Sequence, residues 1–215
     1  MKRLVRNAVS KLIQEYRKTK LPYSVIVAGL GRCGTTLLFD ACRRAVSNEA
    51  LFVVDLERHT FGNQVIKTHD HPPDLLPSDT KVIFMYGDVI NTVVSTTAQI
   101  NDWGTWHFRH MHATTPFPPY EQLYFEDQLG LETQFDAWYC SQPFDLMTVR
   151  YESLYKPETI GMLRAFTGIN LRLPAYRPRK TDGANHSVAP QLRRVYRSLI
   201  SKIDEAADCK VWPRV

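Results

Sequence analysis

A short apolar run that leads straight into a glycine-rich loop constrains the fold of this chain more than any other feature. Residues 23–28 (YSVIVA) are rich in β-branched side chains and do not alternate with polar ones, which is typical of a central parallel strand buried on both faces. Residues 29–36 (GLGRCGTT) follow at once, and residues 35–46 have a helical pattern. The order strand, glycine-rich turn, helix aims backbone amides at an anion. We therefore predict a phosphate-binding loop at residues 29–36.

Strand-like runs alternate with helical patterns along the rest of the chain. The other strand-like runs are residues 51–54, 64–67, 81–85 and 145–150, and the helical patterns cover residues 89–100, 131–139, 157–167 and 188–207. This alternation predicts an α/β fold in which helices cover both faces of a central parallel sheet, the three-layer arrangement of P-loop-type proteins. Since the chain has 215 residues, we expect one such domain over residues 21–215 and a separate helix within residues 1–20.

The N-terminal segment has the pattern of a basic amphipathic helix over residues 2–19. One use of such a helix is contact with an acidic membrane surface. Its apolar stripe is modest and contains no Trp or Phe, so we favour packing against the domain with the cationic face in water. Charged residues interrupt the apolar run, and we therefore expect no signal peptide, no membrane span and a cytoplasmic protein.

The charge balance and the cysteines narrow the class of partner. A net charge of +5 suits an anion, whether nucleic acid, an acidic membrane surface or a nucleotide. We expect no nucleic acid partner, because the sequence has no zinc-finger spacing, RNA-recognition aromatic motif or basic zipper. The four cysteines form no CxxC pair, which argues against a zinc site and against the disulfide framework of a small secreted domain. A reducing compartment and a site without metal follow as expectations.

The composition of the loop indicates which anion it can bind. Its glycines allow successive amides to converge on phosphate oxygens, and two threonines add hydroxyl donors. A nucleoside-triphosphate P-loop needs a lysine directly after the last glycine, whereas this chain has Thr35 there and its cation at Arg32, two residues before Gly34. Cys33 lacks the spacing to an arginine that a phosphatase nucleophile requires, and we interpret it as a small packing residue. The predicted ligand-binding residues of the loop are Gly31, Arg32, Cys33, Gly34, Thr35 and Thr36.

Residues 32–36 (RCGTT) resemble the 5′-phosphosulfate loop of the sulfotransferases that use 3′-phosphoadenosine-5′-phosphosulfate (PAPS). That family pattern has Lys or Arg, then Ser or Thr, then Gly, then two further Ser or Thr residues, and this chain departs from it only at Cys33. The resemblance implies PAPS as the donor. It also implies that Arg32 stabilises charge on the bridging oxygen as the sulfuryl group leaves.

A second segment, residues 66–69 (IKTH), ends a predicted strand at the sheet edge where open α/β folds bind ligands. It resembles the Lys-Thr-His segment of cytosolic sulfotransferases. A neutral imidazole can take the proton that an acceptor hydroxyl loses, so His69 is the candidate base and Lys67 supplies nearby charge. The alternatives are that His71 takes this role, or that His69 is structural.

A third segment, residues 87–95, resembles the 3′-phosphate segment of the family. When Ser95 is aligned with the serine expected on the 3′-phosphate, Asp88 matches but Gly87 stands where the family has arginine and Val89 where it has proline. Loss of that arginine removes a bidentate contact to the phosphate. Either the donor differs or another cation replaces the arginine, and the candidates are Arg177, Arg179 and Lys180.

A weaker segment follows at the expected distance, and a loosely matching one lies near the C-terminus. Residues 149–154 (VRYESL) resemble the end of a family strand, which implies that Tyr151 flanks the adenine. Residues 176–183 (YRPRKTDG) form a basic segment where cytosolic members cover the 3′-phosphate, which implies phosphate contacts for Arg179 and Lys180. Taken from the residues alone, the basic segment is equally consistent with a solvated charge run.

Residues 101–119 have no clear periodicity and contain Trp, His, Thr and Pro, as in a lid or binding loop. We place the acceptor there, a small molecule or carbohydrate against Trp103, Trp106 and His107, rather than a metal.

The sequence therefore predicts a PAPS-dependent sulfotransferase that acts on a hydroxyl or amine. The alternatives are a P-loop kinase or NTPase with Asp88 on magnesium, and a nucleotide-binding protein without catalysis, which Gly87 favours.

Overall fold

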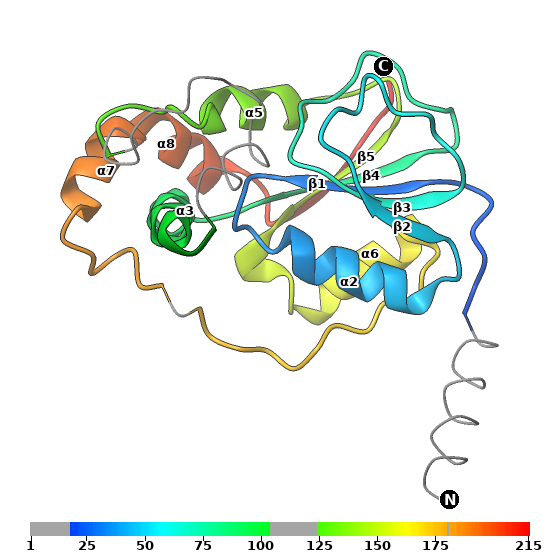
Figure 1. Ribbon diagram of the computed structural model, residues 1–215. Helices are drawn as coiled ribbons and strands as arrows, with labels where there is room; N and C mark the ends of the chain where they lie inside the picture. The colour runs from blue at the N-terminus through cyan, green and yellow to red at the C-terminus, as the bar shows by residue number, and fades with distance from the viewer. Residues whose placement is uncertain (1–17, 104–123, 180) are drawn as a thin grey trace, which may run out of the picture.

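The computed structural model describes residues 18–103, 124–179 and 181–215, and shows an α/β fold around a six-stranded sheet (Figure 1). The strands lie in the order β2-β3-β1-β4-β5-β6. Their bounds are Val25–Gly29 (β1), Glu49–Phe52 (β2), Gln64–Lys67 (β3), Lys81–Tyr86 (β4), Asp145–Arg150 (β5) and Cys209–Trp212 (β6). Strand β1, which precedes the glycine-rich loop, is therefore central, with β3 on one side and β4 on the other.

The sheet is mostly parallel, as the sequence patterns predicted, but it has one antiparallel edge strand that they did not predict. Strands β1 to β5 pair in parallel, but β6 pairs antiparallel with β5 at one edge. The sequence patterns missed β6 because this four-residue strand has no buried apolar run. Side-chain contacts hold it instead: Trp212 donates from Nε1 to Thr148 Oγ1 at 3.2 Å and packs edge-on against Tyr139.

The helices agree in place with the sequence patterns except near the C-terminus. Their bounds are Thr35–Ala45 (α2), Val89–Trp103 (α3), Leu131–Trp138 (α5), Pro157–Thr167 (α6), Ala189–Val195 (α7) and Arg197–Glu205 (α8), with a short 3₁₀ turn at Tyr151–Ser153 (η2). The single helix predicted over residues 188–207 was wrong, because the chain bends at Tyr196 (φ −97°, ψ 22°) and divides into α7 and α8. No glycine or proline marks this bend, so the pattern carried no sign of it.

Two further expectations lie mainly outside the described residues. The N-terminal helix was placed on residues 2–19, of which only residues 18 and 19 are described. The acceptor loop was placed on residues 101–119, of which residues 104–119 are not described. Its first three residues belong to the last turn of α3.

Apolar side chains from the two faces of the sheet belong to two separate core clusters. Ile26 and Ala28 of β1 pack in one cluster with residues of α3, α5, α7 and α8. Val25 and Val27 pack in the other cluster with residues of α2 and α6. Figure 1 shows α2 and α6 on one side of the sheet and α5 on the other. Because all five residues of β1 are buried, the strand reads as an unbroken apolar run.

Candidate functional site

The glycine-rich loop leaves the carboxyl end of β1 and runs directly into helix α2. Leu30 still donates its backbone N–H to Met85 O at 2.9 Å, so the start of the loop stays attached to β4. Gly29 is needed at this point, because a Cβ there would lie 2.4 Å from the same carbonyl oxygen. Gly34 occupies the N-cap position of α2 with a left-handed backbone (φ 82°) and no side-chain cap hydrogen bond. The amides of the first helical turn therefore have no side-chain acceptor.

Arg32 joins the loop to helix α3. It is the one non-glycine residue with positive φ (62°) within the described ranges, and this backbone turns its side chain toward α3. There Arg32 donates from Nε to Ser95 Oγ at 3.0 Å. Two residues that the sequence assigned to different phosphates of the donor are therefore in direct contact.

Cys33 packs into the interior and has no features of a nucleophile. Its side chain is fully buried, and its Sγ lies 3.2 Å from Thr92 Oγ1. Burial raises the pKa of the thiol to about 11, so the group stays protonated at neutral pH. This geometry agrees with the interpretation of Cys33 as a packing residue.

Lys67, the last residue of β3, reaches across to helix α2. Its Nζ donates to Thr36 Oγ1 at 2.8 Å and lies 5.4 Å from the centre of the Phe52 ring. Burial lowers the pKa of Lys67, and the positive charge of Arg32 lowers it further, against a smaller opposing effect of Asp40.

A third cation, Arg179, completes a positive cluster at the loop. The Arg32 side chain is partly exposed. Its partial burial lowers its pKa, and the positive charge of Arg179 lowers that pKa further. Arg32, Lys67 and Arg179 come from three separate segments, and the charge of Arg32 is repelled by both of the others. A bound anion would relieve this repulsion. The cluster and the first turn of α2 thus form a site suited to negative charge.

His69 is buried, with 7% of its surface exposed, and its ring is oriented by the start of the loop. Its Nδ1 lies 2.7 Å from Gly29 O, and because a carbonyl only accepts, Nδ1 carries the proton. In the neutral ring the lone pair is then on Nε2. Helix α5 fixes the backbone here: Gln134 Nε2 donates to His69 O, and Trp138 Nε1 donates to Asp70 O at 2.9 Å. The alternative base, His71, is half-buried.

Tyr151, which the resemblance predicts to flank an adenine, lies against the loop. A Cβ on Gly34 would come within 2.4 Å of Tyr151 Cδ2, so the ring touches the backbone of the loop. The guanidinium of Arg179 lies 4.2 Å from the centre of the same ring. The ring therefore links the loop to the C-terminal basic segment. Lys180, the other predicted cation of that segment, lies outside the described residues.

The position that lacks the family arginine is filled by a carboxylate that sequence reasoning missed. Gly87 is buried, and a Cβ there would lie 3.0 Å from Glu152 Oε2 and 3.1 Å from Oε1. Glu152 also forms an ion pair with Arg179, with Oε1 at 3.4 Å from Nη2. Asp88 caps α3 by accepting from the Asn91 N–H at 2.6 Å. No local pattern announces these contacts, because they join distant segments.

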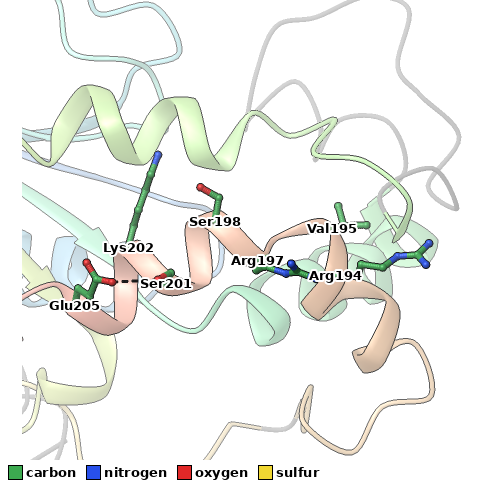
Figure 2. Close-up of a pocket in the computed structure, with 7 residues that line it drawn as sticks. All are labelled: Arg194, Val195, Arg197, Ser198, Ser201, Lys202 and Glu205. Carbon is green, nitrogen blue, oxygen red and sulfur yellow. Dashed lines mark hydrogen bonds between the residues drawn. The ribbon is translucent and has the colours of Figure 1, made fainter.

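A hollow of about 630 Å³ on helices α7 and α8 lies apart from this site (Figure 2). None of its lining residues belongs to the glycine-rich loop. Its Lys202 is already paired with Glu132 at 2.7 Å and Asp136 at 2.6 Å, both on α5. We therefore interpret the hollow as the outer surface of a helix contact.

Over the described part of the chain, no three His, Cys, Asp or Glu side chains are placed to hold a metal ion. Among the same residues, no helix combines the length and the apolar character needed to cross a membrane. Trp103 lies at the end of α3, and its side chain is not described; Trp106 and His107 fall outside the described ranges.

Comparison with protein-family models and with curated proteins gave no match to this chain.

Proposed function

We propose that this chain is a PAPS-dependent sulfotransferase with the three-layer arrangement of P-loop-type proteins. The observation that carries the proposal is that Lys67, through Thr36, and Arg179, through the Tyr151 ring, join Arg32 at the start of α2, where Gly34 provides no side-chain cap. Cations gathered around the N-terminus of a helix suit a phosphate or phosphosulfate group. The sequence resemblance of residues 32–36 and 66–69 to sulfotransferase segments selects the phosphosulfate.

The local chemistry favours this donor over a magnesium triphosphate. Thr35, which stands where a P-loop NTPase has its lysine, is buried with 3% of its surface exposed. Asp88, the candidate magnesium ligand of a kinase, already accepts a backbone N–H at the start of α3. The positive charge at the site comes from Arg32, Lys67 and Arg179 and not from a lysine directly after Gly34.

The proposed reaction is in-line transfer to an acceptor hydroxyl or amine on a small molecule or carbohydrate. His69 accepts the acceptor's proton at Nε2 while the acceptor atom bonds to sulfur. The bond from sulfur to the bridging oxygen breaks, and that oxygen leaves with the electron pair on adenosine 3′,5′-bisphosphate. Arg32, Lys67 and the amides of the loop stabilise the charge that develops on the leaving phosphate. Ser95 and the C-terminal basic segment contact the 3′-phosphate.

Binding of the product nucleotide tests the donor site directly. Adenosine 3′,5′-bisphosphate should raise the melting temperature, and Arg32→Ala should abolish most of that rise. Arg172→Ala removes the same charge from an exposed position and should keep the full rise, which makes it a matched control. Equal stabilisation of Arg32→Ala and the native protein would overturn the site assignment.

Transfer assays then separate the proposal from its rivals. Labelled PAPS incubated with a panel of phenols, sugars and amines should yield labelled acceptor. Gly87, which replaces the family arginine, favours a second candidate, a nucleotide-binding protein without catalysis; that protein would bind the bisphosphate and transfer to no acceptor. Hydrolysis of ATP that depends on magnesium would favour a kinase or NTPase instead.

A further inference from the structure

We infer that Glu152 is a positioning residue of the donor site. Its carboxylate fills the space that glycine leaves at position 87 and holds Arg179 there, so that a guanidinium from the C-terminal segment replaces the one that β4 lacks. The inference rests on the proposed function and deepens it. It assigns specificity for a nucleotide with a 3′-phosphate to the pair formed by Glu152 and Arg179.

Packing couples Gly87 and Glu152 to each other. Both carboxylate oxygens of Glu152 lie within 3.1 Å of the point where a Cβ on Gly87 would be, and Tyr151 Cβ is 3.2 Å from that point. The carboxylate also accepts the Asp88 N–H at 3.2 Å. A larger side chain at position 87 would therefore shift the Glu152 carboxylate from its present position.

Electrostatics explain why this carboxylate orients Arg179. Glu152 pairs with two arginines, Arg179 at 3.4 Å and Arg150 at 3.6 Å. Arg150 is tied to the end of α8 as well, by Ile203 O at 3.2 Å and Asp204 Oδ1 at 3.4 Å. Within the described ranges, Glu152 is the one carboxylate that Arg179 contacts. A guanidinium has five N–H donors, so this single contact leaves several of them for an anion.

The segment that carries Arg179 is docked on the helix face that carries the predicted phosphate ligand. Gly183 donates its N–H to Asn91 Oδ1 at 2.8 Å, and a Cβ on Gly183 would lie 2.8 Å from Asn91 N. Asn91 and Ser95 are four residues apart on α3 and therefore share a face. Arg32 contacts Ser95, and Arg179 lies over the Tyr151 ring, which packs against Gly34, two residues after Arg32.

This arrangement favours a nucleotide that carries a second phosphate on its ribose. The loop amides, Lys67 and Arg32 serve a 5′-phosphate group. Arg179 adds a charged donor, and Ser95 adds a hydroxyl, for a second phosphate on the ribose. A nucleotide without that phosphate would leave Arg179 on Glu152 and gain nothing from it.

Two nucleotides that differ only in the 3′-phosphate test the inference. Calorimetry should show that the native protein binds adenosine 3′,5′-bisphosphate about 10- to 100-fold more tightly than adenosine 5′-monophosphate, as expected for hydrogen bonds to charged groups. Arg179→Ala should bring this ratio close to one. Glu152→Gln, which keeps the size and the acceptor for Asp88, should lower the ratio and leave binding of the monophosphate unchanged. Arg172→Ala should keep the native ratio.

The ratio separates positioning from a merely structural role, because a loss of folded protein lowers both affinities together. If Glu152→Gln fails to fold, Glu152→Asp, which draws the carboxylate back from Arg179, takes its place and should also lower the ratio. A native ratio in Glu152→Gln or in Arg179→Ala, or loss of the ratio in Arg177→Ala instead, would overturn the inference. Equal binding of the two nucleotides to the native protein would overturn it and leave the 5′-site intact. Binding of neither would overturn the proposed function and this inference with it.

Discussion

Replacement of Gly34 by alanine tests whether the shape of the loop depends on the contact between its last glycine and Tyr151. Gly34 combines a left-handed backbone (φ 82°) with close packing, since a Cβ would lie 2.4 Å from Tyr151 Cδ2 and 2.7 Å from Cε2. Both distances are far below van der Waals contact. Alanine therefore has to strain the backbone and also displace the ring.

The two costs can be estimated separately. A left-handed backbone costs a residue with a Cβ about 1–2 kcal/mol. Forcing an extra methyl group into a packed position costs about 1–3 kcal/mol more. We expect Gly34→Ala to lower the free energy of unfolding by about 2–5 kcal/mol, the sum of these ranges. Tyr151 would move with the new methyl group, and Arg179 over its ring would move too.

Gly130 offers a matched control for the backbone cost alone. It is the N-cap residue of α5, has a left-handed backbone (φ 61°) and makes no side-chain cap hydrogen bond. A Cβ added to it would have no atom within 4 Å. Gly130→Ala should therefore cost only about 1–2 kcal/mol. Urea unfolding of the two variants measures the difference, which isolates the Tyr151 contact. Equal losses of unfolding free energy in Gly34→Ala and Gly130→Ala would refute the reasoning, because the Tyr151 ring would then move aside at no cost.

Two further predictions concern the groups proposed for catalysis. His69→Asn keeps an amide that can donate to Gly29 O but removes the base, so transfer should fall about 10²- to 10⁴-fold while the bisphosphate still raises the melting temperature; unchanged transfer would exclude His69 as the base. The pKa of Lys67 is lowered from 10.5, so between that lowered value and 10.5 the unfolded chain holds a proton that the folded one has lost, and stability should rise with pH there. Bisphosphate affinity should fall over the same window, since the anion needs the charged amine. Calorimetry against pH should find in Lys67→Gln neither this rise in stability nor this fall in affinity. If the variant shows the same alkaline profile as the native protein, a group other than Lys67 causes both changes.

The parts of the fold that sequence patterns predicted are those with a buried apolar run. All five residues of β1 are buried, and the run of β4 is buried from its second residue onward, so both were visible as strands. The turn between β1 and α2 was predictable because glycine is needed where no Cβ fits, as at Gly29. Strand β6 was missed because it lies at an edge and depends on contacts of Trp212 with distant residues.

The candidate site was predictable to the extent that it follows single segments. Residues of the loop, Lys67 and His69 lie at the ends of neighbouring strands β1 and β3, where a parallel sheet brings ligands together. The contact of Arg32 with Ser95 was not predicted, because Ser95 lies inside α3 and the sequence assigned it to a different phosphate. The role of Glu152 was hidden, because nothing in residues 149–154 indicates that this carboxylate reaches the end of β4.

The pair formed by Gly87 and Glu152 shows why a departure from a motif has to be judged in space. Glu152 contacts the backbone beside Gly87 although the two segments are 64 residues apart in the chain, as the Asp88 hydrogen bond shows. When only the sequence motif is compared, glycine at position 87 removes a phosphate contact and indicates a site that binds the 3′-phosphate poorly. Read in space, it makes room for a carboxylate that brings Arg179 to the same place. Restoring arginine at position 87 alone would therefore not restore a phosphate contact, because the new guanidinium would meet Glu152 first and form an ion pair with it.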